Sequence, residues 1–81
     1  MVKVKFLGLL RMDLKTRDAE FNAVTVEELL AQIASSFPIS VNDLRNCIIF
    51  VRGKNITQQK LFKTELKDGD EVLFMNAVSG G

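Results

Sequence analysis

Alternating apolar and polar positions mark the start of the chain. Residues 2–10 begin with valine, lysine, valine, lysine and phenylalanine, a period of two that predicts a half-buried strand. A second alternating stretch over 18–24 predicts its hairpin partner, and the charged residues 12–17 are expected to form the connection. Residues 71–75 predict a closing strand, with Val72 and Phe74 on one face and Leu73 and Met75 on the other. The sequence therefore predicts a sheet that uses both ends of the chain.

The clearest local signal is the start of a helix. Thr25 and Glu28 stand in the pattern of a capping box, in which the threonine hydroxyl accepts a hydrogen bond from a backbone N–H near Glu28. Apolar residues then recur at intervals of three and four, which predicts a helix over 26–36 with one buried stripe. The stripe contains Val26, Leu29, Leu30, Ile33 and Phe37. Pro38 is expected to end the helix, because the residue before a proline avoids the helical conformation.

The second half of the chain holds shorter signals. Residues 47–51 form a continuous apolar run, which is typical of a central strand covered on both faces. A short helical turn is expected over 41–44, a short edge strand over 56–61, and a tight turn at the glycine of 67–70. The order is therefore strand, strand, helix, strand, short edge strand and closing strand. This is an α+β fold with one main helix packed on a mixed sheet of four or five strands.

One helix can cover only one face of this sheet, so the other face should be open. An open face normally carries polar residues at alternate positions. Four apolar residues are nevertheless expected there: Leu7, Phe50, Leu73 and Met75. Scattered surface hydrophobic residues are common. Because these four come from strands that should be adjacent, we interpret them as a docking patch for a partner protein.

Composition narrows the classes of function. The 81 residues suit one domain, and 11 basic and 10 acidic residues are interspersed, which argues against nucleic-acid and membrane partners. The apolar runs are too short to span a membrane, and Met1 leads directly into a strand pattern rather than a signal peptide. One cysteine and no histidine fit a reducing cytoplasmic compartment and argue against a transition-metal site. The absence of histidine excludes a histidine-activated nucleophile. We expect a substrate or carrier.

The chain ends with two glycines directly after the predicted last strand. Glycine adds nothing to a core and is costly to order, so such an end is often only frayed. Alternatively, about six residues of tail could reach ~20 Å and present the terminal carboxylate inside a narrow tunnel of another protein. We predict a folded domain over 1–75 and a flexible tail over 76–81, with functional positions at Val78, Ser79, Gly80 and Gly81.

Several segments resemble known proteins. The order of elements and the terminal Gly-Gly resemble the ubiquitin-like β-grasp fold, and residues 50–56 resemble the segment that carries ubiquitin's interaction patch. The sequence LKDGDEV over 66–72, followed by VSGG over 78–81, is similar to the C-terminal signature of the MoaD/ThiS family of sulfur carriers. Residues 5–11 and 25–30 match the first strand and helix start of that family. The likeness is greatest to MoaD, the small subunit of molybdopterin synthase.

The sequence departs from that family pattern in three places. Asn76 and Ala77 replace the two prolines that usually precede the tail, so the tail should be looser where it leaves the sheet. Met12 follows Arg11 where glutamate is common, and Arg52 stands where asparagine is common.

The resemblance implies a carrier chemistry. The Gly81 carboxylate would be adenylated by a MoeB-like enzyme that uses ATP, and a desulfurase or rhodanese would supply sulfur for a thiocarboxylate. The tail would then enter a MoaE-like large subunit and donate sulfur in molybdopterin synthesis. Gly80 would keep the tail narrow, and Val78, Ser79 and the docking patch would contact the partner. The chain itself would bind no cofactor and would not be an enzyme alone.

Three alternatives stay open at this point. The chain could be a ThiS-like carrier for thiamine thiazole synthesis, a ubiquitin-like modifier that forms isopeptide bonds to lysine, or a β-grasp interaction module with an idle tail. The first two share the Gly-Gly tail with MoaD and differ from it in their partners.

Overall fold

The computed structural model describes residues 1–76 of the chain. Within these residues, one mixed sheet has the strand order β2-β1-β5-β3-β4. β1 and β5 are parallel and the other neighbouring strands are antiparallel. The strands are β1 (Val2–Leu7), β2 (Asp18–Phe21), β3 (Ile48–Val51), β4 (Lys54–Asn55) and β5 (Glu71–Met75).

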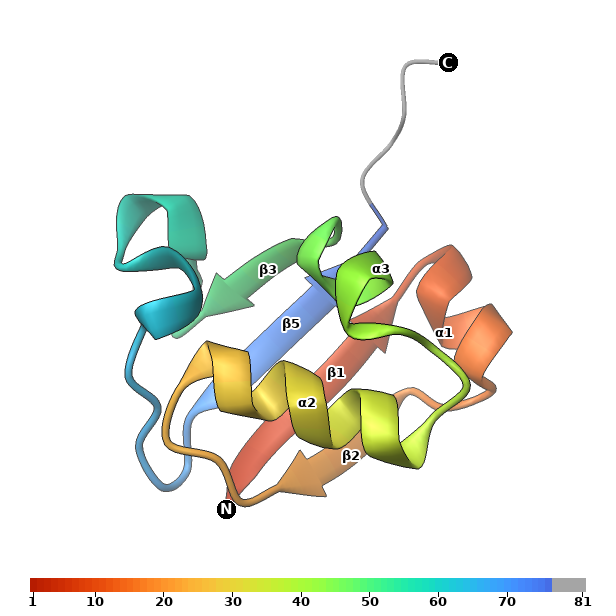
Figure 1. Cartoon of the computed structure of the whole chain (residues 1–81), viewed down its shortest axis with the longest axis horizontal. Helices are drawn as coiled ribbons and strands as arrows, with labels where there is room; N and C mark the ends of the chain where they lie inside the picture. Colours follow the sequence, from red (N-terminus) through yellow and green to blue (C-terminus); the bar gives the residue numbers. More distant parts are fainter. Residues whose placement is uncertain (77–81) are drawn as a thin grey trace.

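The helices gather on one side of this sheet. Figure 1 shows the main helix crossing one sheet face, with the two shorter α-helices on the same side. The α-helices are α1 (Leu9–Leu14), α2 (Val26–Ser36) and α3 (Val41–Arg45), and two 3-10 turns follow, η1 (Ile56–Gln58) and η2 (Leu61–Lys63). The other sheet face carries none of these helices, which confirms the ubiquitin-like arrangement expected from the sequence.

The prediction for α2 is confirmed. The helix spans Val26–Ser36, and the Thr25 hydroxyl accepts a hydrogen bond from the Glu28 backbone N–H at 3.2 Å. The chain becomes extended again at Phe37, directly before Pro38. Four residues of the predicted stripe are buried against the sheet: Val26, Leu29, Leu30 and Ile33.

The core lies between α2 and the covered sheet face. Alternate residues of the strands point into it: Val2, Val4 and Phe6 from β1, Val72 and Phe74 from β5, and Ile49 and Val51 from β3. The Phe6 ring lies 5.5 Å from the Phe37 ring and 5.9 Å from the Phe74 ring, measured between centroids. The period of two in these strands therefore assigns one face to the core.

The N-terminal connection differs from the prediction. The first strand ends at Leu7 and not at residue 10, because Gly8 has a φ of 64° and turns the chain out of the sheet. The segment that follows is the helix α1 rather than a polar loop. Leu10 and Leu14, one helical turn apart, are both buried, and Lys15 ends α1 in a left-handed conformation.

The sheet order also corrects two expectations. Residues 48–51 of the predicted run form β3, an interior strand, but the centre of the sheet is β5, which lies between β1 and β3. The edge strand expected over 56–61 is wrong: the two-residue β4 pairs with β3, and a 3-10 turn follows it. The turn over 67–70 is confirmed, with Gly69 at a φ of 88°. Which strand lies at the centre of the sheet is therefore determined by pairing between distant segments, and local sequence patterns do not show it.

Arg52 stands at the position where the MoaD/ThiS pattern commonly has asparagine. Its φ is 53°, in the left-handed region that asparagine tolerates better than most residues. The Arg52 guanidinium pairs with the Asp70 carboxylate, and Asp70 accepts a hydrogen bond from the Lys67 backbone N–H at 2.7 Å. The arginine therefore links the β3–β4 turn to the turn before β5, although its left-handed backbone conformation is less favourable for arginine than for asparagine.

Candidate partner-docking face

The strand register brings the four predicted docking residues onto one face of the sheet. Leu7 lies opposite Met75, and Phe50 lies opposite Leu73. The register also places Ile48 opposite Met75, a position that the sequence analysis missed. We call this set the apolar face: Leu7, Ile48, Phe50, Leu73 and Met75. All five side chains are half-buried and lie on the side of the sheet away from α2. Their role in binding stays a prediction.

Charged residues occupy the other half of the same face. Lys3 lies opposite Glu20 on β2 and Glu71 on β5. The Lys5 ammonium is 3.4 Å from a Glu71 carboxylate oxygen, and Lys5 lies opposite Asp18. Exposed ion pairs of this kind contribute little to stability. The face is therefore polarised along the strands, with its most apolar end where β1 and β5 finish.

The chain leaves the sheet at this apolar end. Asn76, the last described residue, directly follows Met75 and is half-buried. Its side-chain oxygen is buried and has no hydrogen-bond partner in the described part of the chain. The predicted tail positions Val78, Ser79, Gly80 and Gly81 lie outside the described residues. A partner bound on the apolar face would thus sit beside the point from which the chain continues to residue 81.

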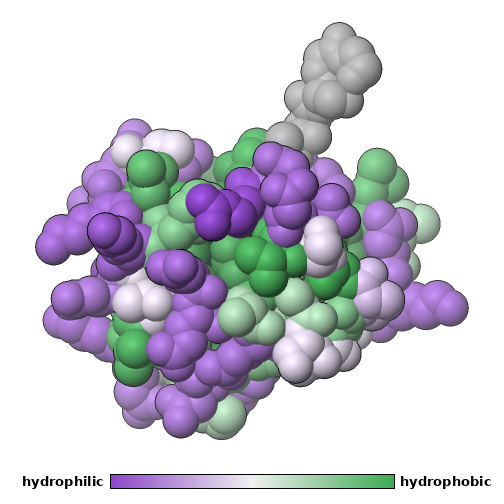
Figure 2. Space-filling view, in the orientation of Figure 1, coloured by the Kyte–Doolittle hydropathy of each residue, from purple (hydrophilic) through white to green (hydrophobic). Residues whose placement is uncertain are grey.

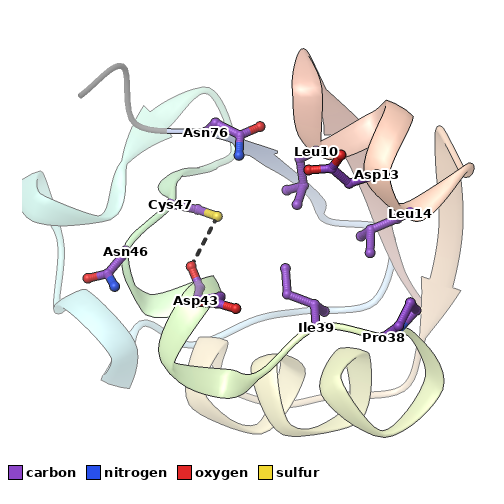
Figure 3. A pocket seen from close by; sticks show the side chains of 9 residues that line it. All are labelled: Leu10, Asp13, Leu14, Pro38, Ile39, Asp43, Asn46, Cys47 and Asn76. Atoms are coloured by element: carbon purple, nitrogen blue, oxygen red, sulfur yellow. Dashed lines mark hydrogen bonds between the residues drawn. The ribbon is translucent and has the colours of Figure 1, made fainter. Parts of the chain in front are cut away.

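A groove of about 450 Å³ lies on the helix side of Asn76, between α1 and α3. Figure 3 shows the side chains that line it: Leu10, Asp13, Leu14, Pro38, Ile39, Asp43, Asn46, Cys47 and Asn76. The Cys47 thiol donates a hydrogen bond to the Asp43 carbonyl oxygen at 3.4 Å. Burial, and secondly the Asp43 carboxylate, raise the pKa of the Cys47 thiol. The thiol is therefore protonated at neutral pH, as expected of a structural cysteine.

Residues 1–76 offer neither a metal site nor a membrane span. This part of the chain contains no group of three or more histidine, cysteine, aspartate or glutamate side chains that could hold a metal ion. None of its helices has the length and apolar character needed to cross a membrane.

Comparison with known proteins decides the family. The model of the ThiS family matches residues 4–81, nearly the whole chain, including the terminal glycines. The chain belongs to the ThiS family. A search of curated proteins finds no match to this ThiS-family sequence.

Solved structures agree with this assignment. The small archaeal modifier protein 1 of Methanosarcina acetivorans is 25% identical, with a TM-score of 0.85, covering 99% of this chain and 95% of that one. A complex of molybdopterin-converting factor subunits 1 and 2 from Helicobacter pylori 26695 contains a chain 27% identical, with a TM-score of 0.67 and coverages of 99% and 97%. The Amycolatopsis orientalis BexX/CysO complex matches over all of both chains, with 24% identity and a TM-score of 0.80, and supports the fold alone. This ThiS-family chain is a small ubiquitin-like β-grasp protein of the sulfur-carrier type.

Proposed function

We propose that the chain carries sulfur for molybdopterin synthesis as a thiocarboxylate on Gly81. The observation that supports this most directly is the family match, which runs through the last residue and not only through the folded domain. The position of the apolar face adds to it, because this face lies at the end of the sheet from which the chain continues to residue 81.

The chemistry requires activation by another protein. A terminal carboxylate has a pKa of about 3.5, is ionised at neutral pH and is a poor electrophile. In the proposed reaction, a MoeB-like enzyme lets a Gly81 carboxylate oxygen attack the α-phosphate of ATP, with loss of pyrophosphate. The outer sulfur of a persulfide on a desulfurase or rhodanese then attacks the acyl-adenylate, displaces AMP and forms an acyl disulfide with Gly81. A second thiol cleaves the S–S bond of this intermediate, which releases the thiocarboxylate and leaves a disulfide on the sulfur donor. ATP is bound by the partner in this scheme.

In this scheme, the chain itself presents its C-terminal residues to the partner proteins. Residues 77–81 can span at most about 17 Å, so the end must enter a partner that lies close to Asn76. The absence of a Cβ at Gly80 and Gly81 leaves the last residues as narrow as a polypeptide can be. A MoaE-like large subunit docked on the apolar face, with Val78 and Ser79 in its entrance, would satisfy both conditions.

The choice of pathway rests on one neighbour. The Helicobacter pylori chain is a molybdopterin-converting factor solved with its second subunit, which supports a MoaE-like partner here. A ubiquitin-like modifier is the second candidate, supported by the similarity to a small archaeal modifier protein. A ThiS-like carrier of sulfur for thiazole is the third. A cytoplasmic location stays part of the proposal.

The test is intact-mass spectrometry after incubation with ATP, a sulfur source and the adenylating enzyme of the same organism. We expect wild type to gain the mass difference between sulfur and oxygen, and the variant without Gly81 to gain none. The deletion should leave the fold unchanged, because every described helix and strand ends by residue 75. Gly81→Ala should be severely impaired, since the added methyl group sits beside the reacting carbon.

The outcome separates the candidates. If the variant lacking Gly81 gained the same mass as wild type, the sulfur would be on another atom and the carrier proposal would fail. Conversion of a cyclic pterin phosphate by the charged protein and a MoaE-like subunit would identify the molybdopterin pathway. Gly-Gly remnants on lysines of trypsin-digested cell extract would instead identify a protein modifier.

A further inference from the structure

Residues 60–64 form a turn that presents an exposed leucine. Leu61 is 50% exposed and has a φ of 53°. A left-handed conformation is unfavourable for a residue with a Cβ, and burial contributes little for a side chain so exposed. Residues held in sparsely populated conformations cluster at functional sites. The backbone conformation and exposure of Leu61 therefore point to this turn as a candidate binding site.

Thr64 holds the turn in place. Its side chain is buried, and its hydroxyl donates to the Leu61 carbonyl oxygen at 2.6 Å and accepts from the Lys60 backbone N–H at 3.2 Å. The Thr64 carbonyl oxygen accepts from the Val26 backbone N–H at 3.1 Å, which fixes the turn to the start of α2. Leu61 is therefore presented by a braced turn rather than by a loose loop.

Positive charge surrounds this leucine. Leu61 and Phe62 line a hollow of about 330 Å³ together with Lys60, Lys63, Arg45 and one acidic residue, Glu27. The Arg45 guanidinium carbon lies 4.5 Å from the centre of the Phe62 ring, a stacking contact that positions the charge without neutralising it. Within residues 1–76, neither lysine nor Arg45 takes part in an ion pair. The hollow is thus lined by two apolar side chains, and its three unpaired cations outnumber its one carboxylate.

The hollow lies apart from the apolar face. The turn packs against α2, on the helix-covered side of the sheet, whereas the apolar face is on the opposite side. Figure 2 shows hydrophobic and strongly hydrophilic residues intermixed at the left of the view, where Figure 1 places residues 56–63. A ligand in the hollow would leave the apolar face accessible.

We propose that this hollow is a second protein-binding site, which takes an acidic segment with one apolar side chain. The apolar side chain would pack on Leu61 and Phe62, and flanking carboxylates would pair with Arg45, Lys60 and Lys63. An apolar centre with a charged rim is the usual arrangement of a protein interface. The opposite charge on the ligand follows from three cations set against one carboxylate. The site does not depend on the sulfur-carrier proposal.

The probe is a capped peptide with a central leucine and two glutamates on each side, titrated into the full chain at low salt. Binding is followed by amide chemical shifts in ¹⁵N-labelled protein. We expect saturable shifts centred on residues 27, 45 and 60–63. The double variant Lys60→Glu/Lys63→Glu should weaken binding at least about tenfold, because it reverses two of the three charges. Leu61→Gly should weaken it severalfold without unfolding, because glycine accepts the positive φ.

Arg11→Glu/Lys15→Glu on and next to α1 is the matched control, with the same change in net charge elsewhere on the molecule. It should bind the peptide within about twofold of wild type, apart from a small long-range effect of charge. Equal loss of binding in both double variants would show attraction by net charge only and would overturn the site. Three other results would also overturn the proposed site. These are chemical shifts that Leu61→Gly leaves unchanged, no binding at millimolar peptide, and binding of a single-stranded RNA oligonucleotide, but not of the peptide, at the hollow.

Discussion

Phe74 and Met75 are neighbours in β5 but face opposite sides of the sheet, so substitutions at the two positions should have different effects on stability. Phe74 is fully buried between the sheet and α2, and Met75 lies half-buried on the apolar face. Removing a buried phenylalanine side chain costs about 3–5 kcal/mol in free energy of unfolding. A domain of this length has about 4–12 kcal/mol in total. Phe74→Ala should therefore remove a large share of the stability.

Met75→Glu should behave differently. Full burial of a methionine side chain contributes about 1.5–3 kcal/mol, so a half-buried one should lose about 1 kcal/mol, and the new carboxylate can reach water. In a complex, the same carboxylate would be buried among Leu7 and Ile48. We expect that to cost at least about 2 kcal/mol of binding free energy, or roughly thirtyfold in Kd, for the adenylating enzyme or the large subunit.

The two quantities are measured separately. Urea unfolding followed by far-UV circular dichroism gives stability, since the chain lacks tryptophan and tyrosine. Isothermal titration calorimetry with the purified partner gives affinity, and Met75→Leu, which keeps size and apolar character, is the control. Equal destabilisation by Met75→Glu and Phe74→Ala would show that the face assignment is wrong. Unchanged affinity of a folded Met75→Glu variant would show that the apolar face is not the interface.

Three further predictions concern local features. Thr25→Ala should lower the free energy of unfolding by about 1 kcal/mol in urea titration, because α2 loses its N-cap, whereas Thr25→Ser should retain it. Leu14→Ala should cost about 2–4 kcal/mol, since Leu14 anchors α1; a loss below about 0.5 kcal/mol would mean that α1 is not packed. Iodoacetamide should alkylate Cys47 more slowly in the native protein than in urea near pH 9, because the folded thiol has the raised pKa. Equal alkylation rates in the native and unfolded protein would contradict the raised pKa. Because the folded thiol has the higher pKa, the free energy of unfolding should also fall as pH rises above the pKa of the unfolded thiol.

Local signals in the sequence predicted the features that depend on neighbours along the chain. The cap at Thr25 and the stripe of α2 are complete within about a dozen residues, so the helix bounds could be predicted. The alternation in β1, and the period of two of any strand applied to β5, likewise separated core residues from the apolar face. Both patterns follow from the geometry of a single helix or strand.

Other features depend on contacts between distant segments. The pairing of β1 with β5 joins the first and last strands, and nothing within residues 47–51 shows that β3 lies off centre. Ile48 was missed, although it lies two residues before Phe50 and the period of two of a strand places both on the same face. The helix α1 was missed because it has only six residues and exposes Leu9 and Met12, although Gly8 and the spacing of Leu10 and Leu14 could have indicated it.

The parallel pair β1–β5 has a mechanical consequence. β1 begins near the N-terminus and β5 ends at residue 75, so opposing forces applied at the two ends act along the strands in opposite directions. Such a load shears all the hydrogen bonds between the two strands together instead of opening them one at a time. β5 is also held by β3 on its other edge. A motor that pulls on residues beyond 76 would therefore meet its greatest resistance at the first strand it reaches, and the rate of forced unfolding, rather than equilibrium stability, would set the lifetime of the protein under tension.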